Sequence, residues 1–145
     1  MFKNILIATD GSELAAHAID HGVKLARALD AKICILTVTQ PFHVFAIEAE
    51  QLEETPTSFR AHMKKQADRI LARAAQVAAG AGIDATTIHL EDDAPNQAIV
   101  RAAESRQCDL IVMASHGRSG MSAMFLGSET LKVLSQSTIP VLVVR

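Results

Sequence analysis

The sequence has no tryptophan, no tyrosine and five phenylalanines, so aromatic residues make up 3% of its 145 residues. A chain this poor in aromatic side chains lacks the stacking platforms that proteins use to bind single-stranded nucleic acid. Its 14 lysines and arginines against 16 aspartates and glutamates give a net charge of -2, which provides no electrostatic footprint for nucleic acid or for an anionic membrane. We therefore expect no nucleic-acid partner and no membrane partner.

Cysteines and long apolar runs are also scarce. Cys34 and Cys108 are too few for a disulfide framework and lack the spacing of a metal site. No apolar run approaches the roughly 18 residues that a membrane helix needs. The N-terminus leads directly into a strand-like segment without the cleavage region of a signal peptide. We expect a cytoplasmic protein.

Short apolar runs alternate with longer helical patterns, and 49% of the residues are hydrophobic, enough for one core. Runs that are apolar on both faces favour strands of a parallel sheet buried between helices. The expected strands are residues 5–8, 33–38, 86–90, 110–113 and 141–144, and the expected helices are 12–29, 59–79, 95–105 and 128–135. The order predicts a single α/β domain over residues 1–145, a Rossmann-like three-layer α/β/α sandwich whose five-stranded parallel sheet has the order 3-2-1-4-5.

Turn and cap residues support these boundaries. Asp10 and Ser12 are cap-type residues before the first helix, Pro95 opens the third, and the glycines at 80 and 82 suit the end of the second. Two long segments, residues 39–58 and 115–127, fit no element, and loops of this length in a compact domain are usually functional.

Ligands of open α/β sheets bind beyond the carboxyl ends of the strands, where the winding direction reverses. In the expected order this point lies between the segment from Thr9 to Ser12 and the segment that begins at Ala114. Gly127 and Ser128 open a helix whose N–H groups and dipole favour an anion, and we expect a left-handed backbone at Gly127. A phosphate chain is a suitable ligand, although no Gly-Lys-Ser/Thr and no Gly-x-Gly-x-x-Gly occurs.

Three segments match the pattern of a known family in order: Lys-Asn-Ile-Leu-Ile-Ala-Thr-Asp-Gly-Ser at 3–12, Cys-Asp-Leu-Ile-Val-Met-Ala-Ser-His-Gly-Arg-Ser-Gly at 108–120, and Ile-Pro-Val-Leu-Val-Val-Arg at 139–145. On these segments the whole chain resembles a universal stress protein. ATP-binding members carry Gly-x2-Gly-x9-Gly-Ser/Thr after the fourth strand. Here Gly117, nine intervening residues, Gly127 and Ser128 match, whereas Ala114 stands at the first glycine.

The resemblance implies an ATP site, with Mg²⁺ accompanying the nucleotide. Ala8 and Thr9 would lie against adenine and ribose, Asp10 would accept from ribose hydroxyls, and Val38 would meet the adenine ring. Met113 and Ala114 would lead to the phosphates. The groups expected around the phosphates are His116, Gly117, Arg118, Gly127, Ser128, Glu129 and Thr130.

We expect a nucleotide-responsive regulator or interaction module in stress adaptation and not an enzyme, because no nucleophile–base pair or metal cluster is visible. A nucleotide-free dimeric interaction protein is the first alternative, favoured by Ala114. A slow ATPase is the second, and it would need a water oriented by His116 or by Mg²⁺. The final expected strand, residues 141–144, is apolar and predicts a homodimer. This expectation holds for the nucleotide-responsive regulator and for the nucleotide-free interaction protein. Asp10 and Ser128 could also be helix caps only.

Overall fold

A five-stranded parallel sheet organises the protein, whose computed structural model describes residues 1–44, 55–117 and 126–145. Within these residues the strand order is β3-β2-β1-β4-β5, and each neighbouring pair is parallel. This confirms the order expected from the sequence. The strands are β1 (Asn4–Ala8), β2 (Lys32–Thr39), β3 (Thr86–Glu91), β4 (Leu110–Ala114) and β5 (Val141–Val144).

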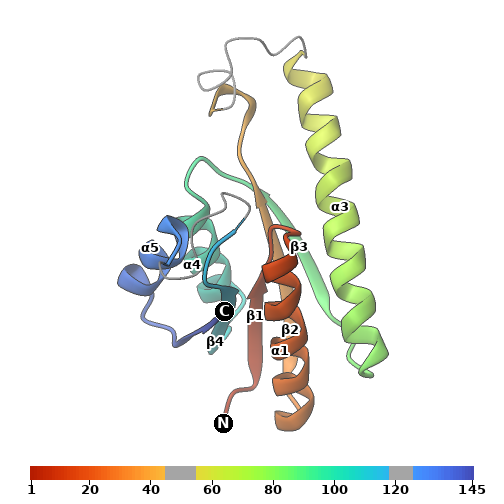
Figure 1. Cartoon of the computed structure of the whole chain (residues 1–145), viewed down its shortest axis with the longest axis vertical. Coiled ribbons are helices and arrows are strands. Elements are labelled where there is room, and N and C mark those ends of the chain that lie inside the picture. The colour runs from red at the N-terminus through yellow and green to blue at the C-terminus, as the bar shows by residue number, and fades with distance from the viewer. Residues whose placement is uncertain (45–54, 118–125) are drawn as a thin grey trace.

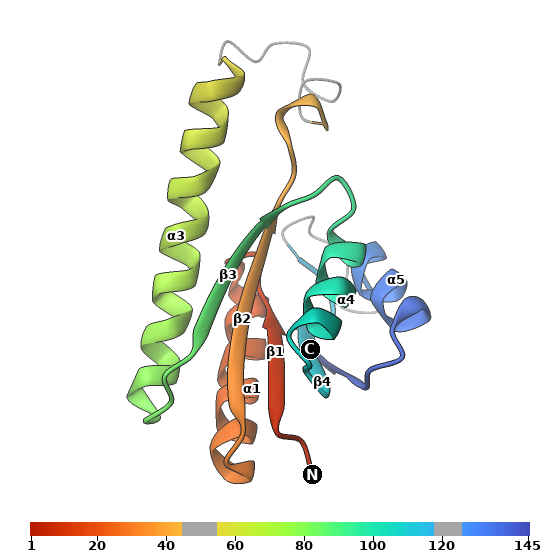
Figure 2. The same cartoon turned by 180° about the vertical axis from the view of Figure 1, so that it is seen from behind.

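Helices cover both faces of the sheet, as Figures 1 and 2 show from opposite sides. They are α1 (Glu13–Leu29), α3 (Pro56–Gly80), α4 (Pro95–Ser105) and α5 (Ser128–Gln136). Ile5 and Ile7 of β1 pack in one apolar cluster with residues of α1 and α3. Leu6 and Ala8 pack in the other with residues of α4 and α5. The α/β/α arrangement follows, because successive side chains of a strand point to opposite faces.

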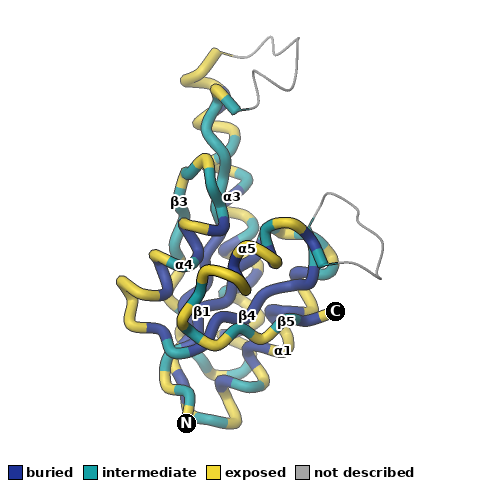
Figure 3. The backbone as a smooth tube through the Cα atoms, turned by 90° about the vertical axis from the view of Figure 1, so that its left-hand side faces the viewer, coloured by how far each residue is buried: buried dark blue, intermediate teal, exposed yellow. Residues whose placement is uncertain are grey.

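The central strands are buried on both sides. Ile5, Leu6 and Ile7 of β1 and Ile111 and Val112 of β4 are completely inaccessible to solvent. Figure 3 shows β1 and β4 as buried segments inside the more exposed helices, with β5 beside β4. A strand with no solvent face needs apolar residues at every position, which explains why the sequence pattern located these strands well.

The second long helix begins earlier than the sequence indicates. Its expected start was residue 59, but α3 begins at Pro56, and Thr55 caps it by accepting from the Ser58 N–H at 3.1 Å. The first turn is exposed and polar, so apolar periodicity could not include it. At the other end Gly82 has a φ of +80°, in agreement with the turn expected there. None of the helices in the described ranges is long and apolar enough to cross a membrane.

Candidate functional site

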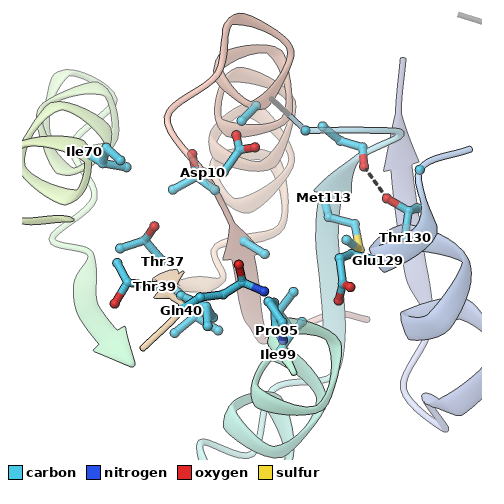
Figure 4. Close-up of a pocket in the computed structure, with 18 of the residues that line it drawn as sticks. Asp10, Thr37, Thr39, Gln40, Ile70, Pro95, Ile99, Met113, Glu129 and Thr130 are labelled. Atoms are coloured by element: carbon cyan, nitrogen blue, oxygen red, sulfur yellow. Dashed lines mark hydrogen bonds between the residues drawn. The ribbon is translucent and has the colours of Figure 1, made fainter. Parts of the chain in front are cut away.

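A cavity of about 560 Å³ lies at the carboxyl ends of β1 and β4, and α3 forms part of its wall. Figure 4 shows Ile70 of α3 on one side of it, Asp10 after β1 at its centre, and Met113, Glu129 and Thr130 on the other side. Its volume lies within the roughly 300–1,000 Å³ of small-molecule sites. This is the position where open α/β sheets bind ligands.

The structure brings together all the expected site residues that it describes. The wall of the cavity includes Ala8, Thr9, Asp10, Val38, Met113, Ala114, His116, Gly117, Gly127, Ser128, Glu129 and Thr130. Arg118, also expected at the phosphates, lies outside the described residues. Segments from three distant parts of the chain therefore meet in one place.

Asp10 joins two of these segments and does not cap α1. Its Oδ1 accepts from the Ser12 N–H at 2.9 Å, while the hydroxyl of Ser12 caps the helix by accepting from the Ala15 N–H at 3.2 Å. The alternative that Asp10 is only a helix cap is wrong, because Ser12 is the N-cap residue of α1. The Asp10 carboxylate also lies against Gly117, where a Cβ would overlap its Oδ2.

Gly127 differs from expectation in two respects. Its φ of -64° is not left-handed, so glycine here serves close packing: a Cβ would lie 3.1 Å from both Cα and Cβ of His116, and the two segments would have to move apart slightly. Its N–H, expected at a phosphate, donates to the Ser115 carbonyl at 2.7 Å. The first hydrogen bond within α5 runs from the Leu131 N–H to the Gly127 carbonyl at 3.0 Å.

The start of α5 therefore presents the N–H groups of Ser128, Glu129 and Thr130 to the cavity, since the first turn of a helix has no internal acceptors. The alternative that Ser128 is a cap is wrong: Gly127 occupies that position, and Ser128 is the first helical residue. Three backbone donors and the positive end of the helix dipole form an arrangement that favours an anion.

Thr130 fixes α5 to the end of β4. Its hydroxyl donates to the Ala114 carbonyl at 3.0 Å, and both residues are buried. Ala114 is an extended strand residue and is not among the residues with positive φ. Alanine in place of the first motif glycine therefore causes no backbone strain.

Charged groups in the described wall are few: the carboxylates of Asp10 and Glu129, together with the ionisable ring of His116. None of the wall residues that the structure describes is lysine or arginine. The Nδ1 of His116 lies 3.2 Å from the Ser115 hydroxyl. In the described part of the chain no three His, Cys, Asp or Glu side chains gather to hold a metal ion.

Sequence reasoning missed the far wall of the cavity. Residues with no expected role in the site line it from β2 and the position after it, from α3, from α4 and from α1: Leu36, Thr37, Thr39, Gln40, Met63, Gln66, Ala67, Ile70, Pro95, Ile99 and Ala15. Met63, Ile70 and Ile99 belong to the apolar stripes of their helices. A stripe indicates a buried face without indicating whether it packs on the sheet or borders a cavity.

Comparisons with known proteins agree with this fold. The model of the family described as "Universal stress protein family" matches residues 1–145. The universal stress protein YxiE of Bacillus subtilis is 37% identical over 149 residues, which cover all of both chains. The fold is thus that of a parallel α/β sandwich with the strand order 3-2-1-4-5, and the chain belongs to the universal stress protein family.

Solved structures are similar over nearly the whole chain. The hypothetical protein MJ0577 has a TM-score of 0.82 and 28% identity, with 99% of this chain and 96% of that chain covered. A universal stress protein crystallised in complex with cAMP has a TM-score of 0.75 and 27% identity, with 99% and 97% covered. That relative binds an adenine nucleotide on this fold.

Proposed function

We propose that the cavity binds ATP and that the protein acts as a nucleotide-responsive regulator or interaction module. The observation that carries this is the convergence of the α5 donors at Ser128, Glu129 and Thr130 with Asp10 in one cavity. The phosphates would lie on α5, the ribose at Asp10, and the base toward Val38. The relative in complex with cAMP supports the adenine part of the proposal.

Mg²⁺ would accompany the nucleotide and not occupy a resident site. The described wall carries two carboxylates, at Asp10 and Glu129, and the described residues form no cluster of three possible metal ligands. Mg²⁺ in nucleotide sites is held mainly by phosphate oxygens and water, with one or two carboxylates. Bound in this way, the ion would neutralise phosphate charge; the residues themselves orient the ligand through backbone donors.

Two alternatives remain as outcomes of the test. A slow ATPase would need a water oriented by His116 or by Mg²⁺, and the His116 ring contacts the Ser115 hydroxyl, which is not a carboxylate. A nucleotide-free interaction protein was favoured by Ala114, but the extended backbone at this residue removes the objection to nucleotide binding.

We also propose that β5 forms a homodimer. It is an edge strand of the described sheet, with Leu142 38% exposed, and Leu131 and Leu134 of α5 are exposed as well. An apolar edge strand readily pairs with a second copy about a twofold axis.

The absorption spectrum of the purified protein tests nucleotide binding with little background. Because the chain has no tryptophan and no tyrosine, an adenine band from bound nucleotide would dominate the near-ultraviolet spectrum. We expect this band in the parent, its release on denaturation, and its absence from Gly127→Val, whose side chain would meet His116. A parent spectrum without the band, together with no binding of added ATP, would favour the nucleotide-free alternative.

A further inference from the structure

Glu129 poses an electrostatic problem in the proposed site. It lies in the first turn of α5, between Ser128 and Thr130, so its carboxylate belongs to the wall that would receive phosphates. Like charges in a protein site of low effective dielectric constant repel more strongly than they do in water. A carboxylate turned toward the phosphates would therefore oppose their binding.

The structure turns one oxygen of this carboxylate to another helix, while the other, Oε1, lies 3.5 Å from Lys132 Nζ on α5. Oε2 of Glu129 accepts from the backbone N–H of Asn96 at 2.8 Å, in the first turn of α4. The cap residue of α4, Ala94, makes no side-chain cap hydrogen bond. Glu129 thus supplies the acceptor that α4 lacks, and its charge lies at the positive end of that helix. Figure 4 shows Glu129 on the side of the cavity where α4 begins at Pro95.

The side-chain amide of Asn96 gives the same carboxylate a second hydrogen bond, in addition to that from the backbone N–H. Asn96 is 4% exposed and lies between Glu129 and Gln136. In the amide orientation that satisfies both neighbours, its amino group donates to Glu129 Oε2 at 3.1 Å and its oxygen accepts from Gln136 Nε2 at 3.2 Å. One buried amide therefore contacts α5 at its first turn and at its last residue.

We propose that Asn96 is a positioning residue for polyphosphate binding: it holds the Glu129 carboxylate against α4, so that the start of α5 receives phosphates through its N–H groups alone. The inference rests on the proposed function. Within it, Asn96 determines how well the site accepts negatively charged ligands. A purely structural role for Asn96 would affect every ligand of the cavity equally. A positioning role affects the ligands that carry phosphates.

Calorimetric titrations of ATP with Mg²⁺, and separately of adenosine, distinguish these roles. Asn96→Asp keeps size and backbone but places a second carboxylate beside Glu129, which repulsion then turns toward the cavity. We expect the ATP affinity to fall by at least about tenfold, as one unit charge near the phosphates implies, and the adenosine affinity to stay within about twofold. The double variant Asn96→Asp with Glu129→Gln should recover most of the ATP affinity, because the repulsion is gone.

Gln97→Glu is the matched control, since it adds one negative charge to the same turn of α4 at an exposed position. It should leave both affinities within about twofold. Asn96→Ser, which removes the amide but keeps a small polar side chain, serves if Asn96→Asp does not fold. Because only the backbone N–H of residue 96 then holds the Glu129 carboxylate, Asn96→Ser should lower the ATP affinity more than the adenosine affinity.

The inference is overturned if Asn96→Asp binds ATP like the parent, if it loses ATP and adenosine equally, or if the double variant shows no recovery. It is also overturned if Asn96→Ser lowers the ATP and adenosine affinities equally. A parent protein that binds neither ligand contradicts the proposed function itself. Failure of the proposed function can therefore be distinguished from failure of the inference about Asn96.

Discussion

The carboxylate of Asp10 occupies the space in which a side chain at Gly117 would begin. A Cβ on Gly117 would overlap Asp10 Oδ2 and lie 3.4 Å from its Cγ. Since Gly117 is not among the glycines with positive φ, glycine serves here for close approach and not for an unusual turn. The loops after β1 and β4 are thereby packed directly against each other at the centre of the cavity.

Gly117→Ala should therefore disturb ligand binding at the cavity. The added methyl group must displace Asp10, and we expect ATP affinity to fall by about tenfold or more, the usual result of losing an oriented charged contact. Gly80→Ala is the matched control, because nothing lies within 4 Å of a Cβ at the exposed end of α3. Calorimetry on both variants checks the prediction; equal affinities in the two would contradict it.

Thr130→Val should weaken the fold at the joint between β4 and α5. Valine has nearly the shape of threonine but leaves the buried Ala114 carbonyl without its 3.0 Å hydrogen bond. We expect the free energy of unfolding to fall by about 1–3 kcal/mol in urea titrations. Thr86→Val, at an exposed position on β3, should change it by less than about 0.5 kcal/mol. A similar loss in the free energy of unfolding in both variants would contradict a stabilising role for the hydrogen bond between Thr130 and Ala114.

Leu142→Glu should dissociate the proposed homodimer without unfolding the chain. The side chain is 38% exposed on the edge strand, whereas Val144 is 6% exposed and belongs to the core, so Leu142 is the better probe. Sedimentation velocity should show a dimer for the parent at micromolar concentration and a monomer for the variant. Val77→Glu, at a 43% exposed position on α3, should remain dimeric. A monomeric parent would contradict the dimer.

The two buried thiols predict a loss of stability at alkaline pH. Burial raises the pKa of the Cys108 thiol from 9.0 to about 11, with a contribution from neighbouring Cys34, whose own pKa burial also raises. The unfolded chain thus loses these protons first, and the free energy of unfolding falls as the pH rises from about 9 to about 11. Urea titrations at about pH 8 and pH 10 should show a smaller fall for Cys108→Ala than for the parent; an equal fall would contradict this.

The central strands β1, β2 and β4 could be predicted from the sequence because burial on two faces requires continuous apolar runs. The start of α3 at Pro56 could not, because its first turn is polar and exposed. The motif spacing located Gly117, Gly127 and Ser128 at the cavity. It could not show that Gly127 packs closely against His116, or that its N–H donates to the Ser115 carbonyl, because both contacts depend on how the chain folds there.

The wall formed by α3 and α4 was beyond sequence reasoning for the same reason. Gln66 lies on a helix that the apolar pattern marks only as amphipathic, and Asn96 is a polar residue in a position that the pattern gives to the core. A buried polar residue acquires a role only through its partners, here Glu129 and Gln136. Those partners come from a different helix, so tertiary structure is needed to identify them.

Titration of ATP with Mg²⁺ into nucleotide-stripped protein, followed by calorimetry, tests the central claim most directly. The account predicts saturable heat with about one ATP per chain and a Kd in the micromolar range, together with a rise in the thermal unfolding midpoint as ligand is added. Gly127→Val should show neither effect while it retains the folded spectrum of the parent. Absence of both heat and thermal shift in the folded parent protein would contradict ATP binding in this cavity.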